Sequence, residues 1–267
     1  MRPLRRTPMS TAATAGAVSA IAALAALALG PAVVAGAAAA SEPSAQSEYQ
    51  AAMKAVGTQG VHFSSTATQS GVKIAVEGDT GSTSGAQTLV VKNGNLTERM
   101  SALLVGSTGY INGNATALHH VIGLTSGQSS KYANRWLSFP TSNSGLDELV
   151  SGLLDSQVSS ELQMGGPYSY STEATVNGKQ ALAIHGSQST QSGGKVAVVL
   201  YVPATGTPLP IEEVTNPSGK GGKSAIRGTV VFSAWGEKTS EKSPTHSVSL
   251  LKLVPGSTSS ATSTTAG

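Results

Sequence analysis

The sequence contains no cysteine, few charged residues and few aromatic residues. The absence of cysteine excludes a disulfide framework, a thiolate metal site, a cysteine nucleophile and a lipid anchor attached through cysteine. Charged residues make up 12% of the chain and aromatic residues 4%, whereas 39% of its 267 residues are hydrophobic. That hydrophobic share is enough to fill a core, so the chain is expected to fold into a globular domain.

The formal net charge of +3 comes from the first residues of the chain. Three arginines within the first six residues precede an apolar stretch at 15–29 and a tract of small residues ending at Ala40. This order is typical of a secretory signal peptide, so residues 1–40 are expected to be cleaved and the protein to be secreted or extracytoplasmic. The alternative is a retained membrane anchor, but the alanine-rich stretch is shorter than the roughly 20 strongly apolar residues of a spanning helix. Cleavage leaves 14 basic and 14 acidic residues, and we therefore expect neither nucleic acid as a partner nor a permanent membrane anchor.

The remainder of the chain, residues 41–254, is expected to form a single domain rich in strands. The S-x-x-Q box at Ser47–Gln50 predicts the start of a helix that ends at Gly57. Short β-branched runs separated by turns every 8 to 12 residues predict antiparallel strands within 61–111 and again within 168–253. Asn177-Gly178, flanked by alternating apolar residues, is the strongest hairpin signal. Residues 255–267 are rich in serine and threonine and are expected to be a disordered tail.

Three helices are predicted between the two runs of strands, at 115–122, at 128–134 and from Ser144 onwards. In the third, Leu146 begins a series of aliphatic residues spaced as on one face of a helix. We therefore expect an α+β fold class, in which one curved antiparallel β-sheet, a half-barrel, has helices packed on its concave face.

No catalytic or metal-binding motif is evident. The sequence has no G-x-S-x-G nucleophile elbow and no calcium loop. The adjacent His119-His120 would point about 100° apart on a helix and could not share a metal ion, and His62 stands isolated in the sequence. The acidic pairs Asp147-Glu148 and Glu212-Glu213 are interpreted as solvated. An enzyme, a metal ion and a cofactor are therefore not expected.

Five segments occur in an order that is familiar from one protein family. They are Gly109–Asn114, Lys131–Leu137, Val176–Ala181, Leu200–Ile211 and Val231–Gly236. Together they resemble actinobacterial exported proteins and lipoproteins of the LolA/LppX/LprG-like group. The resemblance implies a half-barrel that encloses an apolar cavity, in a group whose members carry lipids or acylated proteins or sense the state of the cell envelope. Ala40-Ser41 stands where lipoproteins of this kind have a lipobox cysteine, so a freely secreted protein is expected.

These observations predict a non-catalytic binding protein for an apolar ligand, such as a lipid, a glycolipid or the acyl chain of a lipoprotein. The predicted cavity wall consists of Leu118, Val121, Ile122, Leu146, Leu149, Val150, Leu153, Leu154 and Trp136. The same residues could equally form ordinary core, because every amphipathic helix on a sheet has such a face. The alternative function is an envelope-sensing or protein-interaction module, with an envelope protein as partner and a core filled by its own side chains.

Overall fold

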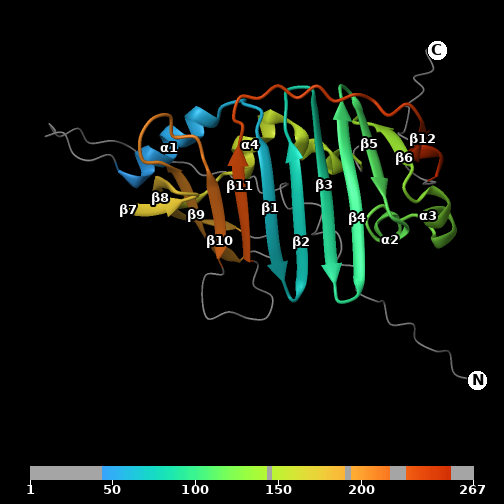
Figure 1. Cartoon of the computed structure of the whole chain (residues 1–267), viewed down its shortest axis with the longest axis horizontal. Coiled ribbons are helices and arrows are strands. Elements are labelled where there is room, and N and C mark those ends of the chain that lie inside the picture. Colours follow the sequence, from blue (N-terminus) through green and yellow to red (C-terminus); the bar gives the residue numbers. More distant parts are fainter. Residues whose placement is uncertain (1–43, 143–145, 190–193, 217–226, 254–267) are drawn as a thin grey trace, which may run out of the picture.

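The computed structural model describes residues 44–142, 146–189, 194–216 and 227–253. Over these residues, twelve strands form one open, curved β-sheet, accompanied by four α-helices and three short 3-10 helices. In Figure 1 one α-helix passes behind the middle of the sheet, and the others lie toward its two side edges. The predicted α+β half-barrel is confirmed.

The strands form two antiparallel meanders that meet in the middle of the sheet. The first half contains β1 (His62–Gln69), β2 (Val72–Asp79), β3 (Ser84–Asn93), β4 (Leu96–Val105), β5 (Thr108–Gly113) and β6 (Trp136–Pro140). The second contains β7 (Gly165–Val176), β8 (Lys179–Ser189), β9 (Lys195–Pro203), β10 (Glu212–Asn216) and β11 (Arg227–Ser233), and β12 (Ser247–Ser249) lies beside β6 at the edge of the first half. Their order is β12-β6-β5-β4-β3-β2-β1-β11-β10-β9-β8-β7. Strands β1 and β11 join the two halves, and β12 alone pairs in parallel, with β6.

The predicted hairpin joins β7 to β8. Val176 pairs with Lys179, so Asn177 and Gly178 form a loop of two residues. Both have positive φ angles, 51° and 76°, as a type I′ turn requires. Asparagine and glycine tolerate this left-handed region better than other residues do, which explains why the sequence signal was reliable.

A long segment carries the chain from β11 to the opposite edge of the sheet. Residues 234–246 run along one end of the strands and reach β12 beside β6 (Figure 1). Thr239 fastens this crossing segment to β3, because its Oγ1 donates a hydrogen bond of 2.7 Å to the carbonyl oxygen of Ser84. Further along, the hydroxyl of Tyr110 donates to Oγ of Ser243 at 3.1 Å. Both bonds tie the crossing segment to the sheet.

Helix α1 (Ala45–Val56) begins three residues earlier than the predicted cap at Ser47 implies. Ser44 is the N-cap, because its side chain accepts a hydrogen bond from the backbone N–H of Ser47. The serine at 47 is therefore already inside the first turn. The end at Gly57 agrees with the prediction, and Gly57 takes a positive φ of 48° there.

The single helix predicted from Ser144 is wrong. Ser144 lies outside the described residues, and after it come two 3-10 turns, η2 (Asp147–Leu149) and η3 (Ser151–Leu153), followed by α4 (Asp155–Glu161). Leu154 is extended between them, with φ −92° and ψ 134°. The backbone N–H of Gly81 donates to the carbonyl of Leu153, and that of Asp155 donates to the carbonyl of Gly81. These bonds to the sheet take the backbone groups that a continuous helix would use.

The other two predicted helices are present, as α2 (Ala115–His120) and α3 (Ser126–Tyr132). Sequence reasoning missed β6, a strand of only five residues that ends in Pro140. The strand predicted at 247–253 is confined to β12, since the 3-10 turn η4 (Leu250–Lys252) follows at once.

Three apolar clusters fill the space between the sheet and the helices. The buried residues of the edge cluster are Ala102, Leu104, Ile111, Leu118, Leu124, Leu137, Phe139, Leu149, Val150, Leu153, Leu250 and Leu253. Those of the middle cluster are Phe63, Val76, Leu89, Val91, Met100 and Ala117. Those of the α1 cluster are Tyr49, Ala52, Val56, Val61, Val158, Leu162, Met164, Ile184, Val198, Leu200 and Val202.

Gly109 supports the edge cluster by leaving room for an aromatic ring. It pairs with Phe139 across β5 and β6, and a Cβ built on Gly109 would lie 2.5 Å from Cζ of that ring. Gly109→Ala is therefore expected to lower the free energy of unfolding by about 1–3 kcal/mol, measured by urea denaturation. Gly127→Ala is the control, because no atom lies within 4 Å of a Cβ at that helical position. Equal stability of the two variants would contradict the packing argument.

No helix among the described residues is long and apolar enough to span a membrane. The predicted signal peptide at 1–40 and the predicted tail at 255–267 lie outside the described residues. Both stay predictions, as does the single domain at 41–254.

Candidate functional site

The residues predicted to line a cavity come together, but they differ in burial. Leu118, Leu149, Val150 and Leu153 are buried within the edge cluster. Val121, Ile122, Leu146 and Leu154 are half-buried and pack against it. Trp136, the first residue of β6, is half-buried. Eight of the nine residues thus form one connected apolar surface, as the sequence pattern predicts.

The four buried residues of the predicted wall are covered by other side chains of the protein itself. Leu118 and Leu153 have no exposed surface, and they share the edge cluster with Phe139 and Leu250. In this conformation the four buried residues are core. Their role in ligand binding stays a prediction.

A second apolar surface, which sequence reasoning missed, lies on the concave face beside the edge cluster. It consists of half-buried side chains packed on the border of the middle cluster, which we call the open strip: Val72, Ile74, Val121, Ile122, Val230 and Phe232. The strands β2 and β11 supply four of them. The register pairs Val76 with Ser65 and Ser65 with Val230, so the side chains at alternate positions of β11, β1 and β2 share one face.

The alternation of large apolar residues in Val72–Val76 was the signal that could have revealed part of the open strip, whereas Val230–Phe232 is a continuous apolar run. The alternation predicts strands with one apolar face, whereas the predicted cavity wall consists of helical residues and Trp136. Val121 and Ile122 belong to both surfaces, because they pack against the edge cluster and the middle cluster.

A carboxyl group is buried in the same face of the sheet. Glu213 on β10 pairs with Val230 on β11 and with Leu200 on β9, and its exposed fraction is 7%. Its Oε2 is buried and has no hydrogen-bond partner. Burial raises the pKa of Glu213 to about 7, because an apolar surrounding disfavours the charged form. The interpretation of Glu212-Glu213 as a solvated pair is therefore wrong for Glu213.

Tyr49 of α1 is the neighbouring titratable group, but its hydroxyl is already engaged. It donates to the carbonyl of Leu162 at 3.2 Å and accepts from the N–H of Met164 at 2.8 Å. Its ring stacks on Tyr168 with centroids 5.1 Å apart. Burial is the main cause that raises the pKa of Tyr49, with a smaller contribution from the charge of Glu213. Tyr49 thus anchors α1 to the loop before β7.

A second buried carboxyl, Glu98 on β4, has a partner for one of its two oxygens, while its Oε2 has none. Its Oε1 lies 2.7 Å from Nδ1 of His120, at the end of α2. The adjacent His119 instead places its Nδ1 2.6 Å from the carbonyl oxygen of Leu124. The two histidines therefore serve different partners, in agreement with the prediction that they point apart.

His62 is not isolated, as the sequence suggested, but belongs to a polar cluster at one end of the sheet. Its Nδ1 lies 2.6 Å from Oδ1 of Asp79, and Glu237 of the crossing segment completes a group whose ligand atoms lie within 4.8 Å of one another. Burial is the main cause that raises the pKa of Glu237, followed by its hydrogen bond to Asp79. Sequence reasoning missed the cluster because Glu237 is far along the chain from the β1–β2 hairpin in which His62 and Asp79 face each other.

The donor set of this cluster, one imidazole and two carboxylates, is one that zinc accepts. However, two ligands of a tetrahedral zinc ion stand about 3.4 Å apart when each is about 2.1 Å from the metal. The separation of 2.6 Å between His62 and Asp79 is instead that of a hydrogen bond. In this arrangement the cluster is a hydrogen-bonded network that fastens Glu237 to β1 and β2.

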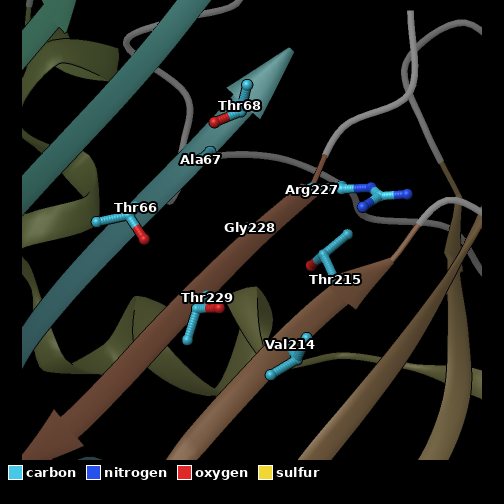
Figure 2. A pocket seen from close by; sticks show the side chains of 8 residues that line it. All are labelled: Thr66, Ala67, Thr68, Val214, Thr215, Arg227, Gly228 and Thr229. Atoms are coloured by element: carbon cyan, nitrogen blue, oxygen red, sulfur yellow. The ribbon is translucent and has the colours of Figure 1, made fainter.

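A shallow pocket with a volume of about 170 Å³ lies where β1 and β10 end and β11 begins (Figure 2). Its lining consists of Thr66, Ala67, Thr68, Val214, Thr215, Arg227, Gly228 and Thr229. Thr66, Thr229 and Val214 line up across the three strands by register, at positions that alternate with those of the open strip. Because four of its eight residues are threonines, the pocket does not suit an apolar ligand.

Comparison with solved structures identifies the fold. LprF from Mycobacterium bovis matches over 75% of this chain and 96% of its own, with a TM-score of 0.51 and 12% identity. The chain has the LprF fold. The lipoprotein LppX of Mycobacterium tuberculosis matches over 73% of this chain and 97% of its own, at 12% identity and a TM-score of 0.44. The resemblance to the LolA/LppX/LprG-like group is confirmed at the level of the fold.

Comparison of sequences adds nothing further. No protein-family model matches the chain, and no curated protein matches it either.

Proposed function

We propose that this protein binds the acyl chain of an amphiphile on the open strip and releases it unchanged. The observation that carries the proposal is the row of half-buried apolar side chains on the concave face of an otherwise well-packed sheet. Half-buried apolar side chains border the edge cluster and the α1 cluster as well, whereas Leu96 is the one large apolar side chain among the described residues that is exposed. Half-buried apolar residues gathered on one concave face indicate a surface that a ligand covers.

The expected driving force is the hydrophobic effect. Each buried methylene contributes about 0.8 kcal/mol, so a chain that buries about eight methylenes would gain roughly 6 kcal/mol. The LprF fold supports the proposal, since the group that the chain resembles includes carriers of lipids and acylated proteins. We further propose that binding takes place outside the cytoplasm, because residues 1–40 have the order of a secretory signal peptide.

A pair of adjacent substitutions tests the surface. Ile74 belongs to the open strip, whereas Ala75 is exposed on the opposite face of β2. We expect the wild-type protein to take up the neutral dye N-phenyl-1-naphthylamine and to release it when monolauroylglycerol is added. Ile74→Asp should weaken the affinity for the dye and for monolauroylglycerol at least tenfold, because a charge would have to be buried beside the bound acyl chain. Ala75→Asp should change either affinity less than twofold.

Failure of the wild-type protein to bind either compound would overturn the proposal, as would equal effects of the two substitutions. Circular dichroism of both variants distinguishes lost binding from lost folding.

The second candidate function is a protein-interaction or envelope-sensing module. It is favoured by the edge cluster, whose predicted cavity wall is filled by the chain's own residues, among them Leu250 and Leu253. This function predicts that amphiphiles do not change the stability of the protein and that crosslinking recovers a specific protein partner from the cell envelope.

A further inference from the structure

Glu213 is the unusual residue in the sheet beneath the open strip. The register places it in a row that runs from Val76 through Ser65 and Val230 to Glu213 and then Leu200. Val230 is half-buried and belongs to the open strip, so the carboxyl group lies next to the proposed ligand surface. The other members of the row are aliphatic, apart from Ser65.

Among the described residues, Glu98 and Glu213 each have a buried Oε2 without a hydrogen-bond partner, but only Glu98 also has an ion-pair partner, at its Oε1. Glu98 is 6% exposed and has His120 at 2.7 Å, whereas Glu213 is 7% exposed and forms no ion pair within the described part of the chain. Tyr49, the titratable group nearest to it on α1, already uses its hydroxyl for Leu162 and Met164. A buried polar atom without a partner is rare and needs an explanation, and a ligand that supplies the missing hydrogen bond is one.

We propose that Glu213 recognises the head of the bound amphiphile, and that this head is an uncharged hydroxyl group such as that of a monoacylglycerol. The inference rests on the proposed function, because the acyl chain must first lie on the open strip. A hydroxyl donates a hydrogen bond to Oε2 without bringing a charge into the apolar interior. A fatty acid would instead place a second carboxylate beside Glu213, and two carboxylates close together cannot both be ionised.

The experiment compares two ligands with the same acyl chain, monolauroylglycerol and laurate, by displacement of N-phenyl-1-naphthylamine at pH 8. The wild-type protein is expected to prefer monolauroylglycerol at least tenfold. Glu213→Gln keeps the shape and removes the charge, so it should bring the two affinities within about threefold, mainly because laurate binds more tightly. Glu212→Gln, a half-buried position next to it in the sequence, is the control and should leave the preference unchanged.

An unchanged preference in Glu213→Gln would overturn the inference, even if both ligands bind. Tighter binding of dodecylamine than of monolauroylglycerol would also overturn it, because the site would then select a cation. Absence of binding by every ligand would instead contradict the proposed function. The two failures are therefore distinguishable.

Discussion

Glu213→Gln is expected to raise the free energy of unfolding by about 3 kcal/mol at pH 8 and by much less at pH 4. Burial moves the pKa of Glu213 from its ordinary value of 4.5 to about 7 in the folded protein. The folded state therefore holds this proton more tightly than the unfolded state does. Since one pKa unit corresponds to 1.36 kcal/mol, the wild-type protein loses about 3 kcal/mol of stability as the pH rises from 4.5 through 7.

Urea denaturation of wild type and variant at pH 4, 6 and 8 measures this difference. The stability difference should grow from pH 4 to pH 8 and level off above about pH 8, because glutamine does not titrate. The groups that face Glu213 agree with its raised pKa. Leu200 and Val230 on the flanking strands are apolar, and Tyr49 is uncharged between pH 4 and pH 8. A difference that is the same at all three pH values would show that Glu213 is ionised and satisfied in the folded protein. Glu212→Gln should change stability much less, because that side chain is half-buried.

The sequence predicts the local features of this fold well, because local signals determine them. Asn177-Gly178 specifies its turn through the conformations that these two residues tolerate. The strand runs are visible because short β-branched segments alternate with glycine turns. Both signals act within a few residues, so they do not depend on what packs against them.

Features that depend on distant partners could not be predicted in the same way. In β10 the sequence Glu212-Glu213 does not reveal which carboxyl group points inward, since only pairing with β9 and β11 decides it. The leucines after Ser144 do share one side, but hydrogen bonds between Gly81 and the backbone on both sides of Leu154 replace the expected helix. His62 lies opposite Asp79 in the β1–β2 hairpin, but Glu237 joins them only because the crossing segment returns along the end of the sheet.

The predicted cavity wall illustrates the same limit. Leu118 and Ile122 both belong to the predicted apolar wall, yet Leu118 is completely buried and Ile122 is half-buried. Their spacing along the chain says that both face the interior. It does not say whether protein or ligand covers them, because that depends on side chains from the other end of the chain, such as Leu250.

A pair of alanine substitutions distinguishes a residue that the protein covers from one that a ligand covers. Leu118→Ala is expected to lower the free energy of unfolding by about 2–5 kcal/mol, because it leaves a cavity among residues that already pack together. Ile122→Ala should cost about 1 kcal/mol, since part of its side chain is already in contact with solvent. Urea denaturation without ligand measures both values.

Ligand binding by the same two variants should show the opposite order. If the open strip holds the acyl chain, Ile122→Ala weakens the binding of monolauroylglycerol severalfold, because methylene contacts are lost at the ligand surface. Leu118→Ala then binds nearly as well as wild type under conditions in which it remains folded, since its contacts are with protein. The reverse order would instead place the ligand inside the edge cluster, and the buried residues predicted from the sequence would then be the true wall. Stability and affinity must therefore be measured on the same variants, because a core residue and a ligand-covered residue differ only in which of the two quantities responds.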